Sequence, residues 1–282
     1  MPEIHIYTFS AGHLEQRGIE QGTLDTLTQR LPRGLYTTFR TFENGRRALD
    51  LRHHLQRLYG PALTRGIQPQ VGEEALRAAL RQIAARFAPG ECRLRPILLL
   101  EERAGELYVL AEAFSPPSPD LYEKGVSVIT VPIPRRHPRL KSTDFIALSA
   151  EIRQKLAQGK AYEAIRVRLT PHCPRGEALE GLTSNFYVLR GRTLITAAEG
   201  ILPGITRRIV LRLARQKGLE ILYRRPCLGE NFEEAFLTSS SRGVVPVVAI
   251  DGQRVGKGEP GPHTRALGEA YDRYVASHAE MI

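Results

Sequence analysis

Residues 234–250 read EAFLTSSSRGVVPVVAI, two apolar stretches on either side of a short polar loop. The first stretch is mostly apolar and the second is rich in β-branched residues, so we expect strands over Glu234–Thr238 and Val244–Ile250. Asp251-Gly252, directly after the second stretch, is typical of a hairpin turn. The loop Thr238–Gly243 offers four consecutive hydroxyl groups, which suit a phosphate or a carboxylate. The residues leave open whether this loop binds an anion or is a plain polar turn.

Strand-like sequence also precedes this pair. The expected strands are Val126–Val131, Ala164–Leu169 and Phe186–Leu189. Two helices are expected, Thr206–Lys217, which Gly218 closes, and His263–Ser277 at the end of the chain. Many strands with few helices indicate an α+β fold with a sheet-rich or barrel-like second half.

The first half mixes short elements. We expect an edge strand over Ile4–Tyr7, a helix over Glu73–Phe87 and an adjacent strand pair, Arg93–Leu100 with Leu107–Ala111. Three prolines within 115–119 (SPPSP) exclude a helix or a central strand there. We therefore predict a small domain over 1–114, a linker over 115–120 and a larger domain over 121–282.

The charge balance argues against several classes of protein. The chain has 282 residues and a net charge of +10, from 40 Lys plus Arg and 30 Asp plus Glu. Only six of the cations are lysines, and the arginines are scattered without a dense basic block, so nucleic-acid binding is not expected. No apolar run approaches the ~20 residues of a membrane helix, and no signal peptide is evident at the N-terminus. The expected location is the cytoplasm.

The three cysteines, Cys92, Cys173 and Cys227, are odd in number and far apart. They form no CxxC pair and no cluster with zinc-ligand spacing. We therefore expect a reduced protein without a structural metal.

One candidate anion site opens the second-half helix at 202–208, LPGITRR. A helix N-terminus carries unpaired N–H groups and a partial positive charge, and Gly204 allows close approach to the backbone. The positive charges of Arg207 and Arg208 oppose the helix dipole, and they are tolerable if an anion binds at this helix N-terminus. An ordinary Pro-Gly turn with solvated arginines remains the alternative.

Three further stretches carry candidate chemistry. Glu180 precedes a strand and is either a solvated charge or the partner of a cationic ring nitrogen. Lys141 follows a basic stretch, 135–139, so neighbouring cations would favour its neutral, nucleophilic amine, although a basic surface loop remains possible. His54 and Arg57 lie three apart on an expected helix and project together, and an inward Arg57 would need an anion.

Taken in order, these motifs resemble the class IV (fold-type IV) pyridoxal-phosphate-dependent aminotransferases. This group holds branched-chain aminotransferases, D-amino-acid aminotransferases and aminodeoxychorismate lyases. The resemblance extends from about Gly34 to Ile250 and rests on the order of five pieces: His54–Leu58, Lys141, 180–186, 202–207 and 238–247. It implies a small N-terminal α/β domain and a larger C-terminal pseudo-barrel domain, with the active site between them in a homodimer.

The resemblance also implies roles for single residues. Lys141 looks like the Schiff-base lysine that moves the proton, and Glu180 like the partner that keeps the pyridine nitrogen of pyridoxal 5′-phosphate (PLP) protonated. The remaining residues are implied as contacts of small anions. The cofactor would be bound by Arg57, Asn185, Ile205, Thr206, Ser239 and Ser240. The substrate would be bound by Thr38, Arg40, Arg95 and Ser241.

Several departures leave the substrate open. Thr37-Thr38 is similar to the aminodeoxychorismate lyases, whereas Arg95-Pro96-Ile97 looks like the branched-chain enzymes. Asp144 stands where relatives have Asn, and this extra carboxylate could pair with one of Arg135, Arg136 or Arg139. The expected reaction is amino transfer between a branched-chain or hydrophobic amino acid and a 2-oxo acid such as 2-oxoglutarate. The alternatives are a D-amino-acid aminotransferase, an aminodeoxychorismate lyase and a non-catalytic PLP-binding protein.

Overall fold

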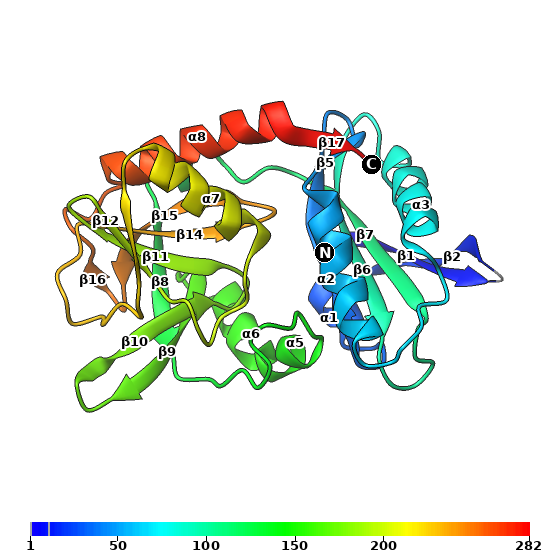
Figure 1. The fold of residues 1–282 in the computed structure, drawn as a ribbon, viewed down its shortest axis with the longest axis horizontal. Helices are drawn as coiled ribbons and strands as arrows, with labels where there is room; N and C mark the ends of the chain where they lie inside the picture. The colour runs from blue at the N-terminus through cyan, green and yellow to red at the C-terminus, as the bar shows by residue number, and fades with distance from the viewer. Residues whose placement is uncertain (1, 11) are drawn as a thin grey trace. The chain divides into compact units, whose positions relative to one another are not determined.

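The structure is a computed structural model that describes residues 2–10 and 12–282 (Figure 1). The chain divides into two compact units. Unit 1 comprises Met1–Ser115, Leu140–Leu148 and Ser277–Ile282, and unit 2 comprises Pro116–Arg139 and Ser149–Ala276. The first division lies within the predicted linker, but the prediction of a continuous second domain over 121–282 differs from these units. The segment that carries Lys141 belongs to unit 1.

Unit 1 is built on an eight-stranded sheet of order β17-β5-β4-β6-β7-β1-β2, with β3 paired to β6. Its strands are β1 (Glu3–Ser10), β2 (His13–Gln21), β3 (Gly34–Tyr36), β4 (Phe39–Phe42), β5 (Arg47–Leu49), β6 (Glu91–Leu99), β7 (Leu107–Phe114) and β17 (Ala279–Met281). Its helices are α1 (Leu24–Thr28), α2 (Leu51–Leu63), α3 (Glu73–Ala85) and α5 (Asp144–Leu148).

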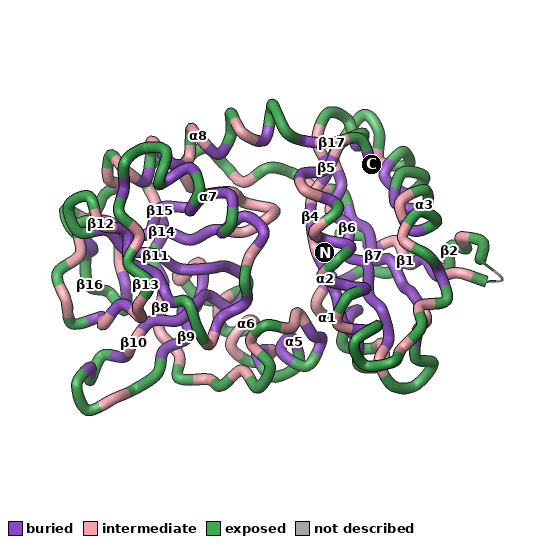
Figure 2. The backbone as a smooth tube through the Cα atoms, in the orientation of Figure 1, coloured by how far each residue is buried: buried purple, intermediate pink, exposed green. Residues whose placement is uncertain are grey.

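Period-two alternation gives this sheet two buried faces (Figure 2). On β7, Leu107, Val109 and Ala111 pack in one cluster with apolar residues of α2 and α3. Tyr108 and Leu110 point the other way, into a second cluster with residues of α1 and α5. Helices therefore cover the sheet on both sides, as an α/β unit requires.

Unit 2 is built on a nine-stranded sheet of order β10-β9-β8-β15-β14-β11-β12-β13, with β16 paired to β15. Its strands are β8 (Val126–Val131), β9 (Glu163–Thr170), β10 (Cys173–Gly181), β11 (Asn185–Arg190), β12 (Thr193–Thr196), β13 (Glu220–Tyr223), β14 (Glu234–Ser239), β15 (Gly243–Ile250) and β16 (Gln253–Arg254). Its helices are α4 (Asp120–Glu123), α6 (Ala150–Gln158), α7 (Ile205–Gln216) and α8 (Pro262–His278), whose last two residues belong to unit 1.

A pairing between β10 and β11 closes six of these strands into a barrel-like ring, as the sequence predicted. The residues that pair there are Glu180 and Asn185. Small and β-branched side chains from all six strands, such as Val128, Ile165 and Val247, fill the interior. The closure of the ring thus fixes the positions of two predicted site residues.

Most predicted elements are confirmed, with two corrections. Ile4–Tyr7 lies in β1, which pairs with both β2 and β7 and is therefore not an edge strand. His263–Ser277 forms most of α8, but β17 follows it and pairs with β5 of unit 1. β17 is only three residues long, too short for the sequence pattern to predict.

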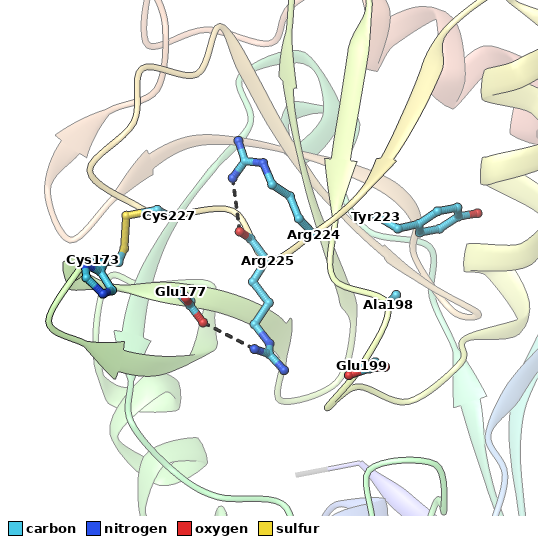
Figure 3. A pocket seen from close by; sticks show the side chains of 9 residues that line it. Cys173, Glu177, Ala198, Glu199, Tyr223, Arg224, Arg225 and Cys227 are labelled. Carbon is cyan, nitrogen blue, oxygen red and sulfur yellow. Dashed lines mark hydrogen bonds and ion pairs between the residues drawn. A yellow bond between two sulfur atoms is a disulfide. The ribbon is translucent and has the colours of Figure 1, made fainter.

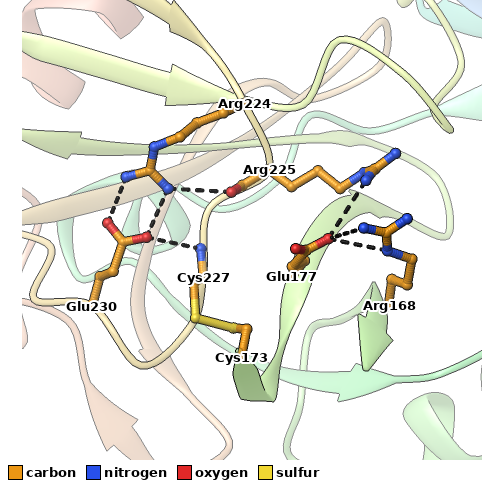
Figure 4. The surroundings of a disulfide bond; sticks show 7 residues. All are labelled: Arg168, Cys173, Glu177, Arg224, Arg225, Cys227 and Glu230. Carbon is orange, nitrogen blue, oxygen red and sulfur yellow. Dashed lines mark hydrogen bonds and ion pairs between the residues drawn. A yellow bond between two sulfur atoms is a disulfide. The ribbon is translucent and has the colours of Figure 1, made fainter. Parts of the chain in front are cut away.

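A disulfide joins Cys173 on β10 to Cys227, 54 residues later (Figure 4). The segment after β13 lies along β10, because Ala178 N donates to the carbonyl of Pro226 at 2.8 Å and Leu228 N donates to that of Gly176 at 3.1 Å. Cys92 is a free, buried thiol. The expectation of a fully reduced protein was therefore wrong, because spacing along the chain does not reveal that β10 and residue 227 are neighbours.

Candidate active site

Lys141 is held by strand-like pairing to β3 within unit 1. Its carbonyl accepts a hydrogen bond from Tyr36 N at 2.8 Å, and Thr143 N donates to the carbonyl of Gly34 at 2.9 Å. A Cβ at Gly34 would lie 2.6 Å from the carbonyl oxygen of Leu98, so this close approach requires glycine. The Lys141 Nζ lies 4.8 Å from the centroid of the Tyr36 ring. The amine is thus positioned by backbone pairing and an aromatic face.

His54 connects Lys141 with Arg57 in the same unit. It is 2% exposed, and its Nδ1 lies 2.6 Å from the Oγ1 of Thr37. Burial, followed by the charges of Arg57 and Lys141, holds the pKa of His54 well below its usual value. The imidazole is therefore neutral. Two predicted site residues, Arg57 and Lys141, lie close enough to lower its pKa through their charges.

Arg95 already has an anionic partner in unit 1. Its Nη1 lies 2.7 Å from Asp25 Oδ1 and 3.0 Å from Thr28 Oγ1, and its Nε donates to Thr38 Oγ1 at 2.9 Å. The guanidinium also lies 5.0 Å from the Tyr36 ring centroid. These contacts fix the Arg95 guanidinium beside Thr38 and Tyr36, and its predicted role in substrate binding stays a prediction.

Arg40 is the other predicted carboxylate ligand. Its guanidinium stacks on two aromatic rings, 4.3 Å from the Phe42 centroid and 5.1 Å from that of Phe114. Such cation–π contacts help to position a guanidinium. Its substrate role stays a prediction.

Glu180 is the most densely bonded residue of the predicted set. Its side chain is 2% exposed and accepts from Arg135 Nη1 at 2.8 Å and from Arg166 Nη1 at 3.0 Å. Its second oxygen accepts from Leu202 N at 2.9 Å. Neither arginine was predicted here: Arg135 was one of three possible partners of Asp144, and Arg166 had no assigned role.

Asp144 pairs with Arg33, whose Nε lies 2.8 Å from its carboxylate. Both residues belong to unit 1, whereas Arg135, Arg136 and Arg139 belong to unit 2. That Asp144 could pair with one of these three arginines stays a prediction. Arg33 lies 111 residues from Asp144 in the sequence and is a partner that sequence reasoning missed.

Asn185 connects Glu180 with the start of α7. Its Nδ2 donates to the carbonyl of Leu202 at 2.8 Å and lies 3.5 Å from Glu180 Oε2. A Cβ at Gly204 would lie 2.0 Å from Asn185 Oδ1, so only glycine fits there. Gly204 is the N-cap of α7 and has no side chain to satisfy the first N–H groups of Ile205 and Thr206. These donors suit a phosphate group.

The two first-turn arginines of α7 were predicted to need an anion. Arg207 does not, because it is 7% exposed and donates to Thr196 Oγ1 at 2.7 Å and to the carbonyl of Ala197 at 2.8 Å. Its partners on and after β12 explain why an arginine is buried there. At the start of α7, the groups that suit a phosphate are therefore the backbone N–H groups and not Arg207.

Tyr271 on α8 was missed by sequence reasoning. Its hydroxyl lies 3.4 Å from Thr206 Oγ1, and its ring would lie 3.2 Å from a Cβ at Gly243. It therefore contacts both the start of α7 and the end of the loop that carries Ser239, Ser240 and Ser241. The two predicted phosphate-binding segments share this neighbour, which its place on an amphipathic helix did not reveal.

Arg242 fixes the same loop. Its Nε donates to Ser239 Oγ at 3.0 Å, and its Nη2 lies 3.4 Å from Glu163 Oε2, a carboxylate that is 4% exposed. Burial acts to lower the pKa of Arg242, but Coulombic attraction to Glu163 and further partners keep that pKa above its usual value. Ser239 thus accepts from Arg242 and keeps its own O–H to donate, and the predicted roles of Ser239, Ser240 and Ser241 stay predictions.

A pocket of about 530 Å³ lies elsewhere in unit 2, beside the disulfide (Figure 3). Three of its charged side chains have partners: Arg225 lies 3.5 Å from Glu177, and Arg224 forms two hydrogen bonds with Glu230 (Figure 4). None of the predicted site residues lines this pocket.

Among residues 2–10 and 12–282, no group of three or more His, Cys, Asp or Glu side chains is arranged to hold a metal ion. In the same residues, no helix has the length and apolar character needed to cross a membrane.

Comparison with known proteins supports the resemblance. Residues 34–250 match the family model of amino-transferase class IV. The chain is 28% identical to D-alanine aminotransferase of Bacillus licheniformis over 271 residues, 86% of this chain and 88% of that one. It is 24% identical to the branched-chain-amino-acid aminotransferase of Pseudomonas aeruginosa over 262 residues, 88% of this chain and 85% of that one. A branched-chain amino acid aminotransferase from T.th., solved with pyridoxamine 5′-phosphate, has the same fold, with a TM-score of 0.80 at 21% identity over 97% of this chain and 94% of that chain.

Proposed function

This chain belongs to the class IV aminotransferase family, and on that premise we propose that it transfers an amino group from a branched-chain or hydrophobic amino acid to a 2-oxo acid such as 2-oxoglutarate. The chain is a PLP-dependent enzyme of this class. The observation that carries the proposal is the match over 34–250, which contains all the predicted site residues. The preference for branched-chain substrates rests on Arg95-Pro96-Ile97 and on the branched-chain relatives.

The residues present fit this cofactor. The first turn of α7 offers uncapped N–H groups behind a glycine, and the loop next to Tyr271 adds the hydroxyl of Ser240. We propose that these groups hold the phosphate together with Arg57. Glu180, with Asn185 beside it, would face the ring nitrogen. When bound, PLP supplies an electron sink for the substrate's Cα.

The side chains of this chain would perform the remaining steps. Lys141 would bind the cofactor covalently and, once displaced by the substrate, carry a proton from the substrate's Cα and return it one atom away. Its Nζ lies against the Tyr36 ring, which limits the directions from which the amine acts. Ser241 and Arg40 would bind the substrate's carboxylate.

A D-amino-acid aminotransferase is the second candidate, because a D-alanine aminotransferase matches 86% of this chain. A half-reaction screen separates the candidates: holoenzyme is mixed with L-leucine, D-alanine or aminodeoxychorismate, and pyridoxamine phosphate or 4-aminobenzoate is measured. Conversion by L-leucine alone supports the proposal, and conversion by D-alanine alone supports the second candidate. Release of 4-aminobenzoate would indicate a lyase, and no conversion by any of them would indicate a non-catalytic binding protein. The homodimer and the cytoplasmic location stay predictions.

A further inference from the structure

Two turns extend beyond the same end of a strand pair in unit 2. β11 and β14 are antiparallel neighbours whose pairing ends at Asn185 and Thr238. The turn 182–184 leads into Asn185, and the turn 240–242 follows the end of β14, so both turns lie past this end of the ladder. The contacts that join the two turns therefore decide where Ser240, a proposed ligand of the phosphate, is held.

A buried side chain, that of Glu163 on β9, contacts both turns. Its Oε2 accepts hydrogen bonds from the hydroxyls of Thr183 and Ser184 in the first turn, the latter at 3.4 Å. The same oxygen lies 3.4 Å from Arg242 Nη2 in the second turn. One oxygen atom thus joins segments that are 20 and 79 residues away from Glu163 in the sequence.

Arg242 carries this link into the second turn. Its Nη2 donates to Thr183 Oγ1 at 2.5 Å, so the Thr183 hydroxyl accepts from Arg242 and donates to Glu163. Its Nε donates to Ser239 Oγ at 3.0 Å, and its carbonyl accepts from the Tyr122 hydroxyl at 2.9 Å. The side chains of Arg242 and Glu163 are 20% and 4% exposed, so water screens their attraction less than that of a surface pair. Loss of one partner would leave the other charge uncompensated and its contacts unsettled.

From these contacts we propose that Glu163 is a positioning residue that holds the turn 240–242 where Ser240 binds the cofactor's phosphate. It would act through Thr183 and Arg242 and touch neither cofactor nor substrate. The inference rests on the proposed function, in which Ser240 is a ligand of that phosphate. Without the charge of Glu163, Arg242 is no longer fixed against the first turn, and the hydroxyl of Ser240 loses its place. The expected loss of affinity is therefore specific to ligands that carry the phosphate.

The test compares PLP with pyridoxal, which has the same ring and aldehyde but no phosphate. The Kd of each ligand for the full chain, freed of cofactor, is measured by fluorescence titration. Glu163→Gln keeps the size of the side chain and removes its charge. We expect the Kd for PLP to rise about tenfold in this variant, as for the loss of one hydrogen bond to a charged group, and the Kd for pyridoxal to stay unchanged. Glu220→Gln, at an exposed position on β13, is the matched control and should change neither Kd.

Thr183→Val provides a second variant, because it removes the hydroxyl between Glu163 and Arg242 and leaves both charges in place. It should also raise the Kd for PLP and not that for pyridoxal, and it decides the question if Glu163→Gln fails to fold. An unchanged Kd for PLP in the folded variants, or an equal rise for both ligands, would overturn the inference and leave the proposed function intact. Wild type that binds no PLP and shows no protein-bound absorbance would overturn the proposed function together with the inference.

Discussion

Thr37 Oγ1 and His54 Nδ1 lie 2.6 Å apart in the interior of unit 1. The hydroxyl satisfies an imidazole that is 2% exposed and that neighbours Arg57 and Lys141. Thr37→Val keeps the shape of the side chain but leaves a buried ring nitrogen without its partner. We expect a loss of ~1–3 kcal/mol in the free energy of unfolding, measured by urea denaturation. An unchanged midpoint would contradict the assigned hydrogen bond.

The depressed pKa of His54 gives stability a defined pH dependence. The unfolded imidazole titrates near ~6.5 and the folded one lower, so the unfolded state binds more protons below that pH. Stability should be full above the unfolded pKa and fall as the pH drops through the interval toward the folded pKa. In His54→Gln this decrease in the free energy of unfolding at acid pH should disappear. His13→Gln, at an exposed position on β2, should retain the decrease.

Lys141 is expected to hold the cofactor covalently. Lys141→Ala should abolish the visible absorbance of protein-bound PLP and reduce turnover below detection, while the variant still folds, because Tyr36 and Thr143 pair with backbone atoms. Lys155→Ala, at an exposed position on α6, is the control and should keep both signals. Full absorbance in Lys141→Ala after removal of free PLP would refute the role.

Gly204→Ala places a methyl group 2.0 Å from Asn185 Oδ1. The Asn185 side chain must then move and lose its contact with Leu202 or Glu180. We expect the Kd for PLP to rise about tenfold or more, equivalent to ~1.4 kcal/mol, in a fluorescence titration. Gly268→Ala on α8, where nothing lies within 4 Å of the added carbon, should leave this affinity unchanged and raise the helix's stability by roughly 0.5–1 kcal/mol.

The disulfide closes a loop with a sequence separation of 54 residues. Loop-closure entropy gives a stabilisation of about 4 kcal/mol for such a loop. Addition of dithiothreitol should lower the Tm of wild type, and Cys173→Ala/Cys227→Ala should have the lower Tm with or without the reductant. Cys92→Ala distinguishes loss of the disulfide from loss of a free thiol, because the Tm of that variant must still fall when reductant is added. Equal Tm values for oxidised and reduced wild type would count against the bond.

The local sequence pattern was sufficient to predict most strands and helices. In β7 and α3, for example, the buried apolar residues follow the spacing expected of a strand and of a helix. The lysine, the glutamate and the start of α7 were found through the order of their motifs. What the sequence could not indicate are partners that only the fold brings together. Arg135 is 45 residues from Glu180, Arg33 is 111 from Asp144 and Tyr271 is 65 from Thr206. Some of the many arginines are likewise explained by ion pairs that only the fold reveals, such as Arg166 with Glu180.

The interleaved course of the chain bears on its synthesis. β17 pairs with β5, and Ile282 N donates to the carbonyl of Arg46 at 3.1 Å, so unit 1 contains residues made more than 200 positions apart. The nascent first 115 residues carry β5 with an unpaired edge until residues 279–281 leave the ribosome. The segment that carries Lys141 to β3 is made in between. The unit that contains the lysine thus begins to form before unit 2 and is completed only after it.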